Sequence, residues 1–242
     1  MARLWCFLIG YAFGLIQTGF LYGKHKGIDI RNYGSGNSGT TNALRVLGPK
    51  GGLIVFAGDM LKAIAASLII RFTFGNMYPE LKYLLIMWGG AGCILAHDFP
   101  FYMGFKGGKG IAATGGTIIG FHWTFFITGL CYFFIPFFVT HYVSLGALIF
   151  YALFMVQLIL TGQLNLFGIF EGMTQASLNE LYILSGCLML LAYWQHRTNI
   201  VRLLKHEERK TFLGKKREPS ELEKQNMASE TEKNEVQNGC KL

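Results

Sequence analysis

Residues 111–140 read IAATGGTIIGFHWTFFITGLCYFFIPFFVT, a largely apolar run without a single Lys, Arg, Asp or Glu. Such a run is typical of helices inside a lipid bilayer. As one helix it would rise about 45 Å, whereas the hydrocarbon core of a bilayer is about 30 Å thick. We therefore expect two short helices that meet near His122, because the polar imidazole of His122 and the nearby Gly120 interrupt the apolar run.

Further apolar segments lie on both sides of this run, and each is about long enough to cross a membrane: 4–22, 53–70, 83–97, 145–161 and 179–194. The chain is 52% hydrophobic and 15% charged, which is typical of an all-α, polytopic integral membrane protein. The first segment begins almost at Met1 and lacks a small-residue cleavage site, so we interpret it as a retained helix. Its two G-x-x-x-G patterns allow close helix packing, either in a dimer or within the bundle.

The positive charges predict how the chain is oriented. Lys and Arg gather in 24–50, 98–110 and 195–217, whereas 162–178 contains none. By the positive-inside rule the rich segments are cytoplasmic, which requires an even number of crossings between them. Two helices in 111–140 satisfy this condition. We predict about seven transmembrane helices, with the N-terminus outside and the C-terminus cytoplasmic.

Composition also predicts the domain organisation and excludes some partners. We expect an integral membrane domain over 1–210 and a polar cytoplasmic tail over 211–242, disordered because it lacks periodic apolar positions. The basic segments flank hydrophobic helices and carry no interleaved aromatics, so we expect no nucleic-acid partner. The five cysteines have no CxxC spacing, and we expect no disulfide framework, no metal site and no cofactor.

Two glycine-rich stretches carry the first candidate chemistry. One is GSGNSGTTN at 34–42, closely followed by Arg45, and the other is GFKGGKG at 104–110. Successive amides with nearby Lys or Arg form a nest for oxyanions, and arginine binds phosphate through two parallel bonds. The second stretch is not a Walker A motif, because no GxxxxGK[ST] pattern fits it. The alternatives are an ordinary surface turn for the first and a lipid-held basic loop for the second.

Other polar residues adjoin the apolar segments. Asp59 and Lys62 are three residues apart and share a helix face, either as a structural ion pair or in catalysis. His97 ends a helix, where it could orient a loop or donate to phosphate. Ser144 begins one, where it could bind an anion or act as an N-cap. The segment from His196 to Arg202 could form a site or a positive-inside anchor.

These segments resemble the motifs of a known family. The stretches 35–45, 96–114, 140–145 and 196–203 are similar, in order and spacing, to the motifs of the bacterial acyl-phosphate:glycerol-3-phosphate acyltransferases of the PlsY type. The resemblance covers roughly residues 1–210. This sequence differs from the family pattern at three positions. Ala63 and His206 stand where the family usually has glycine, and His141 stands where the family usually has a basic residue.

The resemblance implies a seven-helix protein of the inner (plasma) membrane of the cell, whose motifs face the cytoplasm. The implied reaction transfers an acyl group from acyl phosphate to the sn-1 hydroxyl of glycerol 3-phosphate, giving lysophosphatidate and inorganic phosphate in phospholipid biosynthesis. The implied partners are these two substrates, the lipid bilayer and the acyl-phosphate-forming enzyme, which would hand over the donor. No cofactor is implied.

The resemblance also implies roles for individual residues. Catalytic roles fall on Ser35, Asn37, Lys106, Ser144 and His196. Binding of substrate or phosphate falls on a larger set: Gly36, Ser38, Gly39, Thr41, Asn42, Arg45, His97, Gly107, Gly108, Lys109, Arg197, Asn199, Arg202 and Glu208.

Three other classes of protein compete with this interpretation. Glycerolipid acyltransferases that use acyl-CoA or acyl-ACP carry an H-x4-D pair, whereas His25 and Asp29 are spaced H-x3-D. A phosphate or small-anion transporter would also use glycine-rich breaks and buried charge, but its site would lie near the midplane between repeats, and we find no repeat. A structural or assembly protein would have no need of three polar, glycine-rich motifs.

Overall fold

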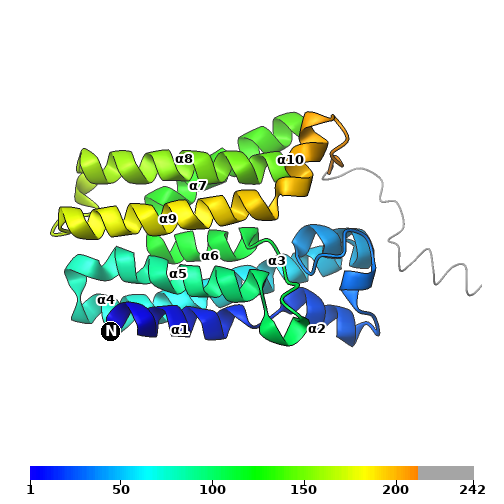
Figure 1. Ribbon diagram of the computed structural model, residues 1–242, viewed down its shortest axis with the longest axis horizontal. Coiled ribbons are helices and arrows are strands. Elements are labelled where there is room, and N and C mark those ends of the chain that lie inside the picture. Colours follow the sequence, from blue (N-terminus) through cyan, green and yellow to red (C-terminus); the bar gives the residue numbers. More distant parts are fainter. Residues whose placement is uncertain (212–242) are drawn as a thin grey trace, which may run out of the picture. The chain divides into compact units, whose positions relative to one another are not determined.

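The computed structural model describes residues 1–211, and these residues form helices and no strand, as predicted (Figure 1). The α-helices are α1 (Ala2–Gly14), α2 (Thr18–His25), α3 (Thr40–Phe72), α4 (Phe74–Met77), α5 (Lys82–Asp98), α6 (Ile111–Phe121), α7 (Trp123–Thr140), α8 (Val143–Gln163), α9 (Gln175–Gln195) and α10 (Arg197–Leu204). Short 3-10 turns connect several of them, among them Pro79–Leu81 and Leu166–Gly168. The predicted polar tail lies, after Thr211, outside the described residues.

Six helical segments of the described chain are long and apolar enough to cross a membrane: Ala2–His25, Thr40–Met77, Pro79–Met103, Trp123–Thr140, Val143–Gln163 and Gln175–Gln195. Helix α6 is apolar but shorter. The predicted break at His122 is confirmed, because this residue is extended (φ −162°, ψ 140°) and its ring accepts a hydrogen bond from the Thr124 amide. The chain is thus a polytopic helical membrane protein, and seven crossings remain a prediction.

The first apolar segment differs from the single helix predicted over 4–22, because α1 ends at Gly14 and α2 begins only at Thr18. The Lys62 ammonium donates to two carbonyl oxygens at this break, those of Ile16 (2.6 Å) and Gly14 (3.4 Å). The Tyr102 hydroxyl donates to the carbonyl of Leu15, at 2.6 Å. These side chains replace helical hydrogen bonds that a break leaves unmade.

The described chain divides into two compact units. The first comprises Met1–Ile16 and the chain from Asp59 onwards, and the second comprises Gln17–Gly58. Helix α3 belongs to both and bends at Gly48, whose φ of 75° precedes Pro49. The second unit has its own small core of Ile30, Ala43, Val46 and Val55.

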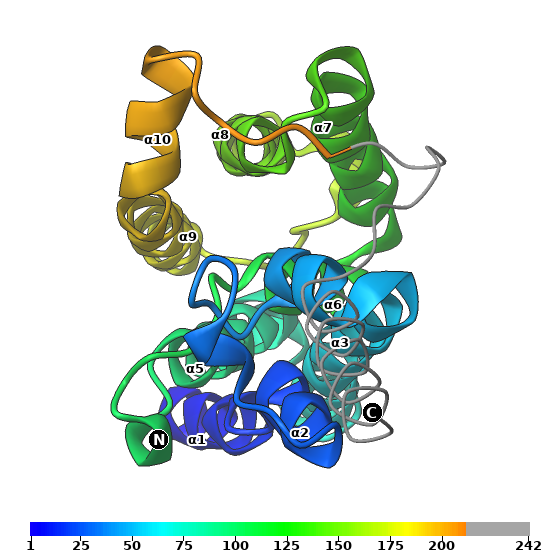
Figure 2. The same cartoon turned by 90° about the vertical axis from the view of Figure 1, so that its right-hand side faces the viewer.

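In the first unit, α5 is buried along most of its length because α1, α6 and α9 pack against it (Figure 2). Close approach to α1 depends on glycine. A Cβ added at Gly10 would lie 1.8 Å from the Gly89 carbonyl oxygen, and one at Gly14 would lie 2.3 Å from that of Cys93. The first G-x-x-x-G pattern therefore packs within the bundle.

Candidate active site

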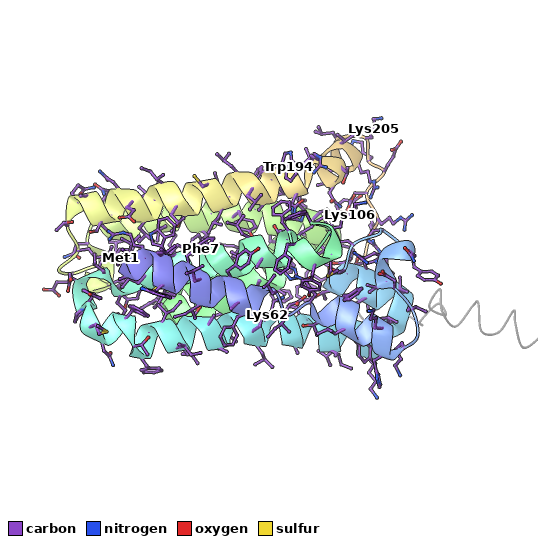
Figure 3. All side chains as sticks on the ribbon, turned by 60° about the horizontal axis from the view of Figure 1, so that its bottom comes forward. Met1, Phe7, Lys62, Lys106, Trp194 and Lys205 are labelled. Atoms are coloured by element: carbon purple, nitrogen blue, oxygen red, sulfur yellow. The ribbon has the colours of Figure 1, made fainter. Side chains whose placement is uncertain are left out.

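The second glycine-rich loop joins α5 to α6 and folds back over the end of α5. The Gly107 amide donates to the Asp98 carbonyl and the Gly108 amide to the His97 carbonyl, both at 3.1 Å. Gly110 ends the loop as the N-cap of α6, with a φ of 71° that favours glycine. Lys106 is exposed and lies at the same end of the first unit as Lys205, away from Met1 (Figure 3). The loop therefore presents an exposed cation beside closely packed backbone amides.

His97 lies buried beneath this loop. Its Nδ1 is 2.9 Å from the Lys62 ammonium, and a Cβ added at Gly108 would lie 2.0 Å from its Nε2. The Asp59 carboxylate is 3.0 Å from the same ammonium and 3.7 Å from His97 Nδ1. This buried cluster thus links the break after α1 to the underside of the glycine loop. Its geometry favours the structural alternative for Asp59 and Lys62 and a loop-orienting role for His97.

A chain of polar contacts joins the second motif, the third motif and Ser144 within the first unit. The Lys109 ammonium donates to the Asn199 side-chain oxygen. The Asn199 amide in turn donates to Glu208 Oε1, at 2.7 Å. The Ser144 hydroxyl donates to the same carboxylate oxygen at 3.0 Å. Sequence reasoning placed these four residues in one site, and the fold brings their side chains into direct contact.

Ser144 lies in the first turn of α8, but it is not the N-cap, which is Tyr142. The N-cap alternative is therefore wrong. The Glu208 carboxylate, which accepts its hydroxyl, lies beside the positive end of the α8 dipole, where an anion is favoured. The segment after α10 is held there by a second bond, from the Thr211 amide to the His141 carbonyl (2.8 Å).

His196 follows the last membrane-spanning helix and is buried between α9 and α10. Its Nδ1 is 2.8 Å from the Ala192 carbonyl oxygen, which assigns the ring proton to Nδ1 and leaves a lone pair on Nε2. Burial, and then the nearby charge of Lys109, lowers the pKa of His196 to about 4. The imidazole is therefore neutral at pH 7, able to accept a hydrogen bond but weakly basic.

This shift predicts an acid-sensitive contribution to stability. The pKa of His196 falls from 6.5 to about 4 on folding, so its contribution is complete above pH 6.5 and is lost as the pH falls towards 4. The loss amounts to about 3 kcal/mol at most. Thermal unfolding in detergent between pH 4 and 7.5 measures it, because the difference between wild type and His196→Asn isolates this group. A difference that does not change with pH would contradict the prediction.

The two arginines of the third motif lie in different surroundings. The Arg197 guanidinium lies 4.4 Å from the Trp194 ring centroid and donates to the Trp194 carbonyl (3.0 Å), so it is fixed on this side chain. Arg202 is exposed on α10. Arg197 is exposed as well, so both arginines are accessible cations and differ in that Arg197 is held on Trp194.

The departures from the family pattern have local structural effects. His206 has a φ of 58° and His141 a φ of 63°, conformations that a β-carbon disfavours. A glycine at position 206 would adopt this conformation without strain. Ala63 is buried, and its Cβ lies close to Gly116 of α6, where an added Cβ would come within 2.9 Å.

In the second unit, the first glycine-rich stretch is organised around the buried Asn42. Its amide nitrogen donates to the carbonyls of Asn37 (2.8 Å), Ile30 and Tyr33 (both 3.1 Å). Its oxygen accepts the Ser35 amide at 2.7 Å. These bonds use the hydrogen-bonding capacity of Asn42 within the loop. Asn42 therefore determines the shape of the loop.

Other residues of this stretch complete the turn. Asn37 accepts the Gly39 amide (2.8 Å), and the buried Ser38 hydroxyl donates to Gln17 (3.4 Å). Gly36 has a φ of 73°. Four residues in or near this stretch are exposed or partly exposed, so a ligand can reach them: Ser35, Gly36, Thr41 and Arg45.

Replacing Asn42 by alanine is expected to destabilise the protein by about 2–3 kcal/mol, because several buried backbone groups lose their partner. Asn32→Ala is the matched control, since Asn32 is an exposed asparagine of the same segment. Thermal unfolding in detergent measures both variants. Equal unfolding midpoints for the two would show that the Asn42 hydrogen bonds do not stabilise the loop.

Sequence reasoning assigned no role to two residues within the second motif, Tyr102 and Asp98. The Tyr102 hydroxyl donates to the Leu15 carbonyl in the break after α1. The buried Asp98 carboxylate lies at the start of α6, where a Cβ added at Gly110 would be 3.1 Å from Asp98 Oδ1. The position of Asp98, an acidic residue between an apolar segment and Pro100, is the feature of the sequence that could have indicated a role for it.

Fold and site together define a polytopic membrane protein with a cationic, amide- and hydroxyl-bearing site at one end of its larger unit. The family model for glycerol-3-phosphate acyltransferase matches residues 4–206. The chain therefore belongs to the glycerol-3-phosphate acyltransferase family.

Similar proteins agree with this assignment. The chain is 39% identical over 206 residues to glycerol-3-phosphate acyltransferase 2 of Lactobacillus acidophilus, covering 84% of this chain and 87% of that protein. It is 34% identical to glycerol-3-phosphate acyltransferase of Bacillus subtilis, covering 84% and 94%. The fold matches the crystal structure of PlsY (YgiH), an integral membrane glycerol 3-phosphate acyltransferase, in its glycerol 3-phosphate form. The TM-score is 0.74 at 28% identity, covering 88% of this chain and 96% of that one. The lysophosphatidic acid form of PlsY gives a TM-score of 0.72 at 27% identity.

Proposed function

We propose that this protein transfers a fatty acyl group from acyl phosphate to the sn-1 hydroxyl of glycerol 3-phosphate. The products are 1-acyl-glycerol 3-phosphate (lysophosphatidate) and inorganic phosphate. The observation that carries the proposal is the contact chain from Lys109 through Asn199 and Glu208 to Ser144, with Lys106 exposed on the same loop. The glycerol 3-phosphate and lysophosphatidic acid forms of the PlsY crystal structure support the acceptor and the product.

The proposed reaction balances without a cofactor. The acceptor oxygen forms a bond to the carbonyl carbon, and the bond from that carbon to the phosphate oxygen breaks. The hydroxyl proton ends on the departing phosphate or on another phosphate oxygen. Acyl phosphate is an activated mixed anhydride, so positioning and stabilisation of negative charge supply most of the acceleration.

Each polar group then has a defined task. Lys106, Lys109, Arg45 and Arg202 neutralise phosphate charge, since cations aimed at developing negative charge stabilise the transition state. Ser144, bonded to Glu208, positions a reacting group at the start of α8. His196 is neutral and offers Nε2 as an acceptor.

The first motif has a separate part in the proposal. The Ser35 hydroxyl and Thr41 orient substrate oxygens, while Asn37 and Asn42 hold the loop in shape, as their bonds to its backbone indicate. Gly36, with its positive φ, allows a ligand to approach the backbone closely.

The competing donors and functions find less support. Asp29 forms an ion pair with Arg31 at 2.7 Å, and this partner lowers the pKa of the carboxyl. Asp29 is thus engaged with an arginine, which argues against a catalytic dyad with His25. An anion transporter would hold its ligand near the midplane, whereas Lys106 and Lys109 follow the end of α5 and His196, Asn199 and Arg202 follow the end of α9.

The proposal includes an orientation. The basic second and third motifs face the cytoplasm across the inner membrane of the cell, where the acyl-phosphate-forming enzyme hands over the donor. A cysteine introduced at position 106 should therefore react with an impermeant thiol reagent only from the inside of right-side-out vesicles. Labelling of intact vesicles from outside would show that the second motif faces away from the cytoplasm.

The deciding experiment uses purified protein in lipid, with palmitoyl phosphate and glycerol 3-phosphate. Released phosphate and lysophosphatidate are followed together, with acyl-CoA and acyl-ACP as parallel donors and Lys106→Ala as the site variant. Equal amounts of both products from acyl phosphate alone, lost in the variant, are expected. Product from acyl-CoA or acyl-ACP instead would refute the proposed donor. Absence of product from every donor, together with anion uptake into proteoliposomes, would establish the transporter.

A further inference from the structure

A polar cavity lies in the first unit, at the end opposite the glycine-rich loop. Its volume is about 470 Å³, within the range of small-ligand sites. Its walls come from the start of α5, the turn between α6 and α7, and the connection between α8 and α9. Because α5 and α6 both run from this end to the loop 104–110, the cavity is separated from the candidate active site by a full helix length (Figure 1).

The cavity is lined by groups of both charges. Lys82 is half-buried, with its ammonium 4.8 Å from the Tyr83 ring centroid, and the exposed Glu171 comes from the connection between α8 and α9. Among residues 1–211 neither forms a salt bridge. Arg71 adds positive charge behind the turn, where its guanidinium donates to the carbonyls of Gly120 (3.0 Å) and Phe121 (3.1 Å).

His122 contributes a hydrogen-bond donor. Its Nδ1 accepts from the Thr124 amide at 3.3 Å and is 2.8 Å from the Thr124 hydroxyl, which places the ring proton on Nε2. The cavity therefore offers a cation, a neutral N–H donor and a carboxylate. A phosphodiester suits the first two groups, and an ammonium suits the third.

Two aromatic side chains indicate the depth of the cavity in the membrane. Trp123 and Phe167, which both line it, are 66% and 89% exposed. Tryptophan side chains at the ends of membrane helices mark the level of the lipid headgroups, and Trp123 is the first residue of α7. The cavity thus opens at the height where headgroups lie, which favours a lipid over a solute.

We propose that this cavity binds the headgroup of a zwitterionic phospholipid that carries a primary ammonium, such as phosphatidylethanolamine. Its phosphate contacts Lys82 and His122, and its ammonium contacts Glu171. A phosphomonoester fits less well, because one lysine opposed by one carboxylate does not compensate a dianion. The lipid belongs to the leaflet opposite the glycine-rich loop, so the site is distinct from that of the substrates.

Lipid retention by the full-length protein tests the proposal. Purified protein is titrated with phosphatidylethanolamine or phosphatidylglycerol of identical acyl chains, and bound lipid is counted by native mass spectrometry. One phosphatidylethanolamine is expected to be retained at least roughly fivefold more tightly than phosphatidylglycerol, and Glu171→Gln is expected to abolish this preference. Lys82→Gln is expected to weaken retention of both lipids. The exposed Lys205→Gln, at the other end of the first unit, is the matched control and should change neither value.

Two results would overturn the proposal. One is equal retention of the two lipids by wild type, or a preference that Glu171→Gln leaves unchanged. The other is displacement of the lipid by millimolar glycerol 3-phosphate or inorganic phosphate, which would identify a site for soluble phosphates. Because Glu171 is exposed, its variant should fold even if Lys82→Gln does not, and it alone decides the headgroup preference.

Discussion

Replacing Lys62 by methionine is expected to lower the free energy of unfolding by about 3–5 kcal/mol, the largest effect on stability expected of any single substitution here. The change removes the partner of the Ile16 carbonyl (2.6 Å), of His97 Nδ1 (2.9 Å) and of the Asp59 carboxylate (3.0 Å). Asp59 would then be a buried charge without compensation. For a chain of this size the unfolding temperature in detergent should fall by roughly 10 °C.

Two further variants show whether the cause is electrostatic. Lys205→Met removes an exposed lysine and should leave the unfolding temperature unchanged. Asp59→Asn in the Lys62→Met background should recover part of the loss, because it removes the uncompensated charge. An unfolding temperature that the second substitution lowers further would show that the pair does not act as a unit. Catalytic involvement of Lys62, rather than structural support, would appear as lost activity at an unchanged unfolding temperature.

Replacing Gly108 by alanine is expected to reduce kcat/KM at least roughly a hundredfold, because displacement of a substrate-binding group by about 1 Å costs that much. The added Cβ would lie 2.0 Å from Nε2 and 2.7 Å from Cε1 of His97. The ring cannot simply retreat, since Lys62 holds its other side. The loop carrying Lys106 and Lys109 must therefore shift. Acyl transfer from palmitoyl phosphate to glycerol 3-phosphate measures the effect.

Gly115→Ala is the matched control for this substitution. It lies on α6, close to the loop, and an added Cβ would meet only the Met60 Cε, at an ordinary 3.5 Å. Activity within about twofold of wild type is expected, with a slight gain in helix stability from alanine. If Gly108→Ala were as active as this control, close packing of the loop on His97 would have no importance for the reaction.

The sequence predicted the helix pattern well where local composition decides it. The break at His122 follows from an apolar run too long for one helix, and the structure has it at that residue. The break after Gly14 could not be predicted, because the groups that satisfy it, Lys62 and Tyr102, are distant in sequence. Nothing in residues 4–22 alone indicates that three carbonyls will be bonded from outside the segment.

The site shows a similar division. The resemblance to the family motifs implies that Lys109, Asn199, Ser144 and Glu208 belong together, and their side chains form a chain of contacts. Composition could not distinguish a residue that faces a ligand from one that supports the loop. Asn42 illustrates this, because its amide was interpreted as substrate-binding, whereas its bonds run to the backbone around it.

Helix α6 contains only 11 residues and rises about 16 Å, roughly half of the about 30 Å hydrocarbon core. Its two ends cannot both reach a membrane surface. Since α5 has 17 residues, the start of α6 is recessed relative to the end of α5, and the glycine loop between them folds back over that end. In the proposed reaction, the water-soluble acceptor enters this recess from the aqueous side, whereas the acyl chain of the donor stays in the lipid. The depth of this recess, and with it the path of each reactant, depends on how thick the surrounding membrane is.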